Sequence, residues 1–235
     1  MGMALLVVGI RDPFAWRWQT EPSDHRAALV AELWAAQRRG DPVLDCCSLY
    51  RDAKCAGHYF LDQSGGAVQL VPEAQRAWHA GRGAWGGCTD VNSASIGIEL
   101  CNAGDHAFSA AQMQALKSLL KEVMQRWGIA AQGVIGHSDM APGRKQDPGR
   151  WFEWSDLAKD GLAVYRGAPH SPPLPFVEAA ERFGYSRPEG AAAEQALLEA
   201  FRQRFRPKAT GPLSDADQQI LSDLAQSYPA ARPAA

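Results

Sequence analysis

Four polar residues have the side-chain types that hydrolytic enzymes use, and three of them share one loop. Glu99 interrupts an apolar segment, His137 directly follows another, and Lys145 and Asp147 lie further along the loop 137–149. Taken singly, each has an ordinary explanation: a solvated strand carboxylate, a loop histidine, a surface charge and an Asp that begins a turn. Only their combination suggests chemistry.

The combination suits a catalytic zinc site. Neutral imidazole and carboxylate groups bind zinc well, and catalytic zinc sites use about three protein ligands and a water. Zinc lowers the pKa of that water toward about 7, a nearby Glu takes its proton, and a Lys stabilises the oxyanion of a tetrahedral intermediate. Spacing alone leaves a zinc hydrolase as one hypothesis among several.

The elements that must position these residues are strands and amphipathic helices in the first 168 residues. Apolar runs predict strands at residues 5–8, 57–62, 67–71, 95–100 and 134–136. Helical spacing predicts helices at residues 24–39 and 109–127, the second with Ser109 as its N-cap and Gly128 after its end. This mixture predicts an α/β fold with a mixed central sheet flanked by helices.

A proline-rich segment divides the chain. Residues 169–175 hold four prolines, which cannot continue a helix and favour an extended linker. Beyond it, helical spacing predicts three helices, at residues 176–183, 191–205 and 214–227. We therefore expect a domain over residues 1–168, a linker over 169–175 and a small three-helix domain over 176–235.

Composition excludes several classes of protein. The chain has 235 residues, 46% of them hydrophobic, and a net charge of −2, so neither whole-chain disorder nor nucleic-acid binding is expected. No apolar run is long enough to span a membrane, and no Sec signal precedes the first strand. The cysteines are odd in number and sparse, which favours reduced thiols; they are Cys46, Cys47, Cys55, Cys88 and Cys101.

Three motifs carry a resemblance to a known family. The runs Ala77-Trp-His-Ala-Gly81, Asn92-Ser-Ala-Ser-Ile-Gly-Ile-Glu-Leu100 and Gly136-His-Ser-Asp-Met-Ala-Pro-Gly-Arg-Lys-Gln-Asp-Pro-Gly149 resemble those of AmpD-like N-acetylmuramoyl-L-alanine amidases. That family shares its fold with the peptidoglycan recognition proteins. It cleaves the amide between the lactyl group of N-acetylmuramic acid and L-Ala. The tail resembles the family's peptidoglycan-binding module, so the resemblance extends over residues 57–229.

The resemblance implies a role for each candidate residue. His137 and Asp147 match two of three zinc (Zn²⁺) ligands, Glu99 matches the catalytic acid/base, and Lys145 matches the residue that stabilises the intermediate. The implied partner is peptidoglycan or a muropeptide, with no nucleic acid and no membrane span.

The same resemblance implies a substrate groove. His79 and Asn92 lie in the motifs that line it, and Trp78 and Trp85 are candidates for stacking on sugar, although burial is at least as good an interpretation for Trp78. Without a Sec signal, the implied location is either the cytoplasm or, after export by a signal-independent secretion system, the periplasm.

The match breaks at the first zinc ligand, a His at the end of the family's first strand. If residues 5–8 form that strand, the ligand position falls on Gly9; if residues 43–44 do, it falls on Asp45, with Cys46 beside it. His25 and His58 are weaker alternatives. Two hypotheses follow: a zinc amidase whose third ligand is unidentified, or a metal-poor, inactive relative that binds peptidoglycan or muropeptide as a regulator or protective partner.

Overall fold

The computed structural model describes residues 3–8 and 57–230 of the chain. The helix predicted at residues 24–39 lies outside these residues. So do Gly9, on which the first ligand position falls, and three candidates for the missing ligand, namely His25, Asp45 and Cys46.

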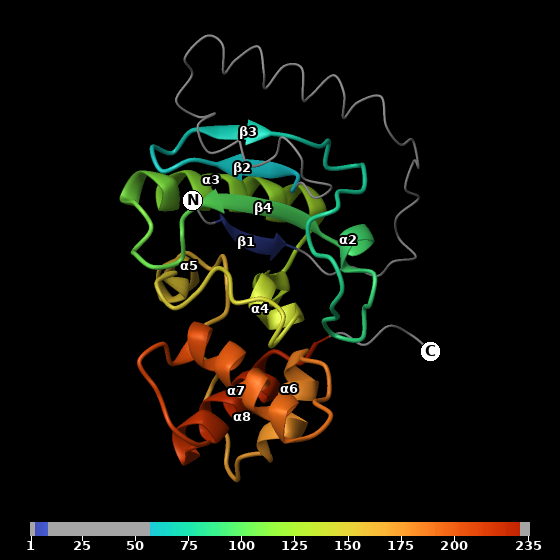
Figure 1. Cartoon of the computed structure of the whole chain (residues 1–235), viewed down its shortest axis with the longest axis vertical. Helices are drawn as coiled ribbons and strands as arrows, with labels where there is room; N and C mark the ends of the chain where they lie inside the picture. The colour runs from blue at the N-terminus through green and yellow to red at the C-terminus, as the bar shows by residue number, and fades with distance from the viewer. Residues whose placement is uncertain (1–2, 9–56, 231–235) are drawn as a thin grey trace.

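Five strands form one mixed sheet, as the sequence predicts. They are β1 (Met3–Val8), β2 (Tyr59–Leu61), β3 (Ala67–Gln69), β4 (Ile96–Cys101) and β5 (Val134–Gly136), in the spatial order β3-β2-β4-β1-β5. β2 runs parallel to β4, and the other neighbours are antiparallel, including the predicted hairpin of β2 and β3. β1 lies between β4 and β5, and Figure 1 shows it beside β4.

One face of the sheet packs on α3 (Ala110–Trp127). Ser109 caps the start of this helix, because its hydroxyl accepts a hydrogen bond from Gln112 N, and Gly128 ends it in the left-handed conformation with φ 59°. The leucines of the helix pack on the even-numbered side chains of β1, such as Leu6, and of β4, such as Ile98. Ser109 and Gly128 are the residues that the sequence predicted at these ends.

The opposite face carries α2 (Val91–Ala94), α4 (His137–Met140) and the C-terminal helices. The 3-10 turn η4 (Ala131–Gly133) precedes β5, and α5 (Trp154–Lys159) packs with α3, because Trp154 and Leu157 belong to the same buried cluster as the leucines of α3. The three C-terminal helices are α6 (Phe176–Phe183), α7 (Ala191–Phe205) and α8 (Asp215–Ser227), at the predicted positions. α4 lies between the sheet and these helices (Figure 1).

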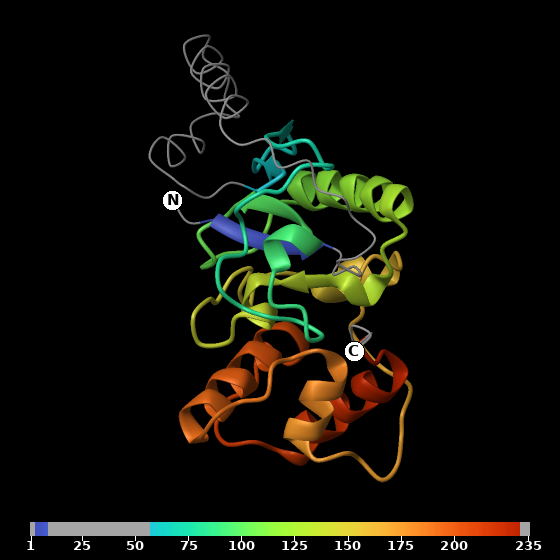
Figure 2. The same cartoon turned by 90° about the vertical axis from the view of Figure 1, so that its right-hand side faces the viewer.

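The C-terminal helices, which we call the helical unit (residues 176–228), share a core with the sheet. A single cluster of buried side chains joins Leu5 of β1 and Ile135 of β5, through Met140 of α4, to Phe201 and the other apolar residues of the helical unit. Figure 2 shows the unit seated directly beneath the sheet. The division into two domains stays a prediction, and the two parts are held together by continuous packing.

The cysteines differ from expectation at one position. Cys101, at the end of β4, is disulfide-bonded, so the prediction of a reduced thiol is wrong there. Cys88 is a free, buried thiol whose pKa is raised by burial. Within residues 3–8 and 57–230, no helix is long and apolar enough to cross a membrane.

Candidate functional site

Glu99 is buried on the face of the sheet that carries α4. In the register of β4 and β1 it lies opposite Leu5, so the two side chains share a face. Glu99 is only 7% exposed, and its Oε1 accepts a hydrogen bond from Gly57 N at 3.0 Å. Of the two interpretations of this carboxylate, the structure excludes the solvated one.

His137 and Asp147 meet at the end of β5. His137 is the first residue of α4, directly after the strand, and its Nδ1 lies 3.0 Å from Asp147 Oδ2. The loop is closed by Ser138 N, which donates to Asp147 O at 2.9 Å. Asp147 Oδ2 also accepts a hydrogen bond from Leu5 N at 3.0 Å. The structure therefore joins the two predicted ligands beside β1.

The contacts of His137 give a partner to each ring nitrogen. Nε2 lies 2.8 Å from Ala80 O, and since a carbonyl can only accept, Nε2 donates there. Nδ1 faces the carboxylate of Asp147, which it meets either as a second N–H donor or, where it carries a lone pair, as a partner in holding a metal ion. Tetrahedral zinc ligands lie about 3.3 Å apart, close to the separation here. Burial raises the pKa of Asp147, but the interaction with His137 outweighs it, and the pKa lies below its ordinary value.

The described residues supply only two donors for a metal. No group of three or more His, Cys, Asp or Glu side chains in residues 3–8 and 57–230 is placed to hold an ion, and Leu5, the β1 residue beside Asp147, is apolar. His58 is committed elsewhere, because its Nδ1 accepts from Gly97 N and its Nε2 contacts Gln75 O, both at 3.0 Å. The donor chemistry of His137 and Asp147 fits zinc, and residues 3–8 and 57–230 supply two of the three expected ligands.

His79 and Asn92 support the segment that contacts His137. Asn92 Oδ1 accepts a hydrogen bond from Ala80 N at 2.9 Å, and the His79 ring contacts Ser95 Oγ through Nε2 at 3.0 Å. Both residues are buried, and burial lowers the pKa of His79 well below its ordinary value. His79 and Asn92 thus support the segment whose Ala80 carbonyl contacts the His137 ring. The spacing of residues in the sequence motifs does not reveal this contact.

Trp85 is buried and Trp78 is exposed, which is the reverse of what the sequence favours. Trp85, predicted to stack on sugar, is 4% exposed, and its ring is covered edge-to-face by Phe183 and Tyr185. Trp78 is 57% exposed, with the guanidinium of Arg76 4.1 Å from its ring centre. The exposed indole face in this segment is therefore that of Trp78.

Two cations follow α4. Lys145 is half-buried, and its side chain has no hydrogen bond or ion pair with any residue that the structure describes. Arg144 reaches the site instead: its Nη2 donates to Ala80 O at 2.8 Å and lies 3.4 Å from His137 Nε2. Burial, with help from Arg82, lowers its pKa. Arg144 was missed because an Arg beside a motif Lys has no distinguishing pattern.

A pocket opens beside Asp147. Its volume is about 270 Å³, and it is lined by residues 102–104, residues 146–151 and Gln203 of α7. Trp151, more than half exposed, stands at its edge. A buried acid, a His–Asp pair and a pocket adjacent to Asp147 define a hydrolase-type site on an α/β fold.

Comparison with known proteins gives the family. The N-acetylmuramoyl-L-alanine amidase family model, Amidase_2, matches residues 16–150. The amidase AmiD of Escherichia coli is 37% identical over 185 residues, which cover 68% of this chain and 67% of that protein. The chain belongs to the N-acetylmuramoyl-L-alanine amidase family.

Two solved structures have the same fold. The complex of E. coli AmiD with anhydro-N-acetylmuramic acid-L-Ala-D-γ-Glu-L-Lys has a TM-score of 0.70 and 34% identity, covering 77% of this chain and 83% of that one. AmpDh3 of Pseudomonas aeruginosa bound to an anhydromuramic pentapeptide has a TM-score of 0.71 and 29% identity, covering 78% and 88%. The likeness covers more than three quarters of this chain in both comparisons.

Proposed function

We propose that this protein hydrolyses the amide between N-acetylmuramic acid and the L-Ala of a peptidoglycan stem peptide, with zinc as its metal. The observation that carries the proposal is the meeting of His137 and Asp147 beside the buried Glu99, in a chain of the amidase family. The substrates bound to E. coli AmiD and to AmpDh3, both anhydromuramyl peptides, support a muropeptide as the ligand.

In the proposed reaction, water attacks the lactyl carbonyl carbon and the C–N bond breaks. Glu99 takes a proton from the water and returns it to the departing nitrogen of L-Ala, so that the products are a carboxylate on the sugar and a free amine. His137 and Asp147 would hold zinc, which supplies an activated water and polarises the carbonyl when it is bound. The ammonium of Lys145 and the guanidinium of Arg144 supply positive charge for the oxyanion.

We propose that the substrate binds in the pocket beside Asp147. Its rim carries the exposed indole of Trp151, an aromatic surface suited to a sugar ring or peptide. For the helical unit we retain the proposal of contact with the cell wall. The disulfide at Cys101 supports export to an oxidising compartment over the cytoplasm, because disulfides persist in such compartments.

A matched pair of variants tests the proposal on an anhydromuramyl tripeptide. Glu99→Gln should lower kcat by about 10²–10⁴-fold, the usual range for a lost general acid/base, while zinc content measured by mass spectrometry stays at the wild-type level. The control is Glu153→Gln, since Glu153 is exposed at the start of α5. Equal activity of the two variants would contradict the role of Glu99, and loss of zinc in Glu99→Gln would make it a ligand.

One observation favours a second candidate function. Because the described residues provide two donors rather than three, a relative that binds muropeptide without cleaving it is the alternative. Zinc titration of the whole protein separates the two. Stoichiometric zinc with turnover supports the amidase, whereas substrate binding with neither zinc nor turnover supports the binder.

A further inference from the structure

A buried carboxylate lies two residues after His137 and has no part in the proposed chemistry. Asp139 is 1% exposed and accepts three hydrogen bonds, all at 2.8 Å. Gly136 N donates to Oδ2 from the end of β5. The other two donors, the hydroxyl of Tyr185 on Oδ1 and Nη1 of Arg204 on Oδ2, come from the helical unit.

Arg204 ties α7 to the strand that precedes His137. Its Nη2 donates to Val134 O at 3.2 Å and to Val164 O at 3.0 Å, and its guanidinium lies 3.9 Å from the ring centre of Trp154. The side chain is 2% exposed. A single buried cation thus contacts β5, α4 and the entrance of α5 from one helix of the unit.

Hydrogen bonds fix the backbone on both sides of His137, and Asp139 makes one of them. Before the histidine, Gly136 N donates to the Asp139 carboxylate; after it, Ser138 N donates to Asp147 O. The ring of His137 then reaches Asp147 Oδ2. The relative position of the two candidate ligands therefore depends on a turn that Asp139 braces.

Close packing keeps the helical unit in the place that this contact requires. Gly86 N donates to Gly184 O at 2.7 Å, and a Cβ on Gly184 would lie 2.5 Å from the Trp85 ring. Tyr185, the next residue, packs edge-to-face on the same ring. In Figure 2 the unit meets the rest of the chain directly below the sheet.

We propose that Tyr185 and Arg204 are positioning residues for the amidase site: through Asp139 they set the geometry of the His137–Asp147 pair. The inference rests on the proposed function and gives the helical unit a role in the reaction in addition to any contact with the wall. It also means that removing the unit exposes the shared core and leaves Asp139 without two of its three donors.

The sharpest test removes one hydroxyl. Tyr185→Phe keeps the aromatic packing and loses only the hydrogen bond to Asp139, and Tyr165→Phe is the matched control, because Tyr165 stacks on Phe205 at the same interface. Since small misplacements at a reacting centre are costly, we expect kcat of Tyr185→Phe to fall about three- to tenfold with KM within about twofold of wild type. The control should match wild type in both.

A second variant and a second measurement make the test decisive. Arg204→Met should lower kcat further, and hydrogen exchange at the amides of Gly136 and Ser138 should quicken in both variants while exchange in α3 stays unchanged. If the wild type is active and Tyr185→Phe keeps the kcat of the control, the inference is wrong. If the wild type is inactive, the proposed function fails, and unchanged exchange at the two amides then overturns the inference separately.

Discussion

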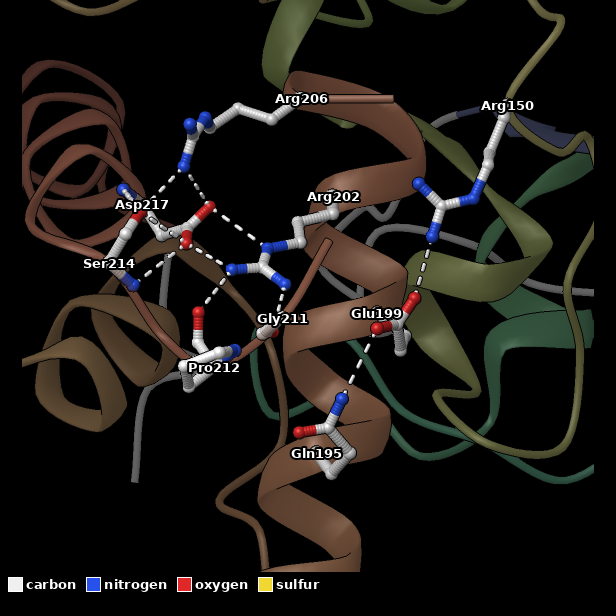
Figure 3. Close-up of polar contacts among 9 residues, drawn as sticks. All are labelled: Arg150, Gln195, Glu199, Arg202, Arg206, Gly211, Pro212, Ser214 and Asp217. Atoms are coloured by element: carbon white, nitrogen blue, oxygen red, sulfur yellow. Dashed lines mark hydrogen bonds and ion pairs between the residues drawn. The ribbon is translucent and has the colours of Figure 1, made fainter. Parts of the chain in front are cut away.

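The strongest stability prediction concerns a buried ion pair inside the helical unit. Arg202 of α7 is 1% exposed and lies against the fully buried Asp217 of α8, with Nη2–Oδ2 and Nε–Oδ1 distances of 2.6 and 3.2 Å (Figure 3). Arg202 also donates to the carbonyls of Gly211 and Pro212 at 2.6 and 2.7 Å. Its guanidinium therefore donates hydrogen bonds both to a carboxylate of α8 and to backbone carbonyls of the loop before α8.

Replacing Arg202 by Met should destabilise the protein strongly. Removing one partner of a buried pair typically costs about 3–5 kcal/mol, because a buried charge is left uncompensated. Asp217 keeps hydrogen bonds from Arg206 Nη1 and from Ser214, so we expect the lower end, about 3 kcal/mol. For a chain of this size that corresponds to a fall in Tm of roughly 6–12 °C.

Urea unfolding at pH 7 measures this change, with Arg206→Met as the control. The Arg206 side chain contacts the same carboxylate but is 27% exposed, so its loss should cost only about 1 kcal/mol. Adding Asp217→Asn to Arg202→Met should recover part of the stability, because the unpaired charge disappears. Equal free energies of unfolding for Arg202→Met and Arg206→Met would refute the reasoning.

The pH dependence of the same variant gives an internal check. Burial raises the pKa of Asp217, but hydrogen bonds from Arg202, Ser214 and Arg206 outweigh it and hold the pKa well below its ordinary value. The contribution of this carboxylate is therefore present above about pH 4 and is lost as the pH falls further. The destabilisation by Arg202→Met should shrink at acid pH.

Two further predictions concern His58 and Trp85. Burial lowers the pKa of His58 to about 4, so its contribution to the free energy of unfolding is complete above about pH 6.5 and falls by about 1.4 kcal/mol per pH unit below it. His58→Gln should lack this part of the loss, and an equal fall in the urea midpoints of the two proteins between pH 7 and pH 5 would contradict the prediction. Trp85→Ala should cost about 3–5 kcal/mol by opening the core shared with the helical unit, whereas Trp151→Ala, at an exposed ring, should change the free energy of unfolding by less than about 0.5 kcal/mol.

Local patterns in the sequence predict most of the elements. α3 begins after Ser109 and ends before Gly128, because capping and left-handed termination are properties of single residues. The proline-rich segment and the spacing of apolar residues likewise predict α6, α7 and α8. The strand at residues 5–8 is also found, as β1.

Contacts between distant segments are what the sequence does not reveal. From its residue type, Trp85 is a candidate for stacking on sugar. It is buried because Tyr185, a hundred residues later in the chain, packs against its ring. Asp139 has no pattern that distinguishes it from a loop carboxylate until Arg204 is placed beside it. The pairing of β1 with β4, which puts Leu5 beside the site, is likewise a consequence of tertiary packing.

The most direct test of the proposed activity identifies the products. The whole wild-type protein, supplied with zinc, is incubated in H₂¹⁸O with anhydro-N-acetylmuramic acid-L-Ala-D-γ-Glu-L-Lys, and the mixture is examined by mass spectrometry. Amidase activity at this site predicts a free tripeptide that begins with L-Ala and a lactyl sugar acid carrying one ¹⁸O atom. Intact substrate in the presence of zinc, or ¹⁸O found only in the peptide, would contradict the account.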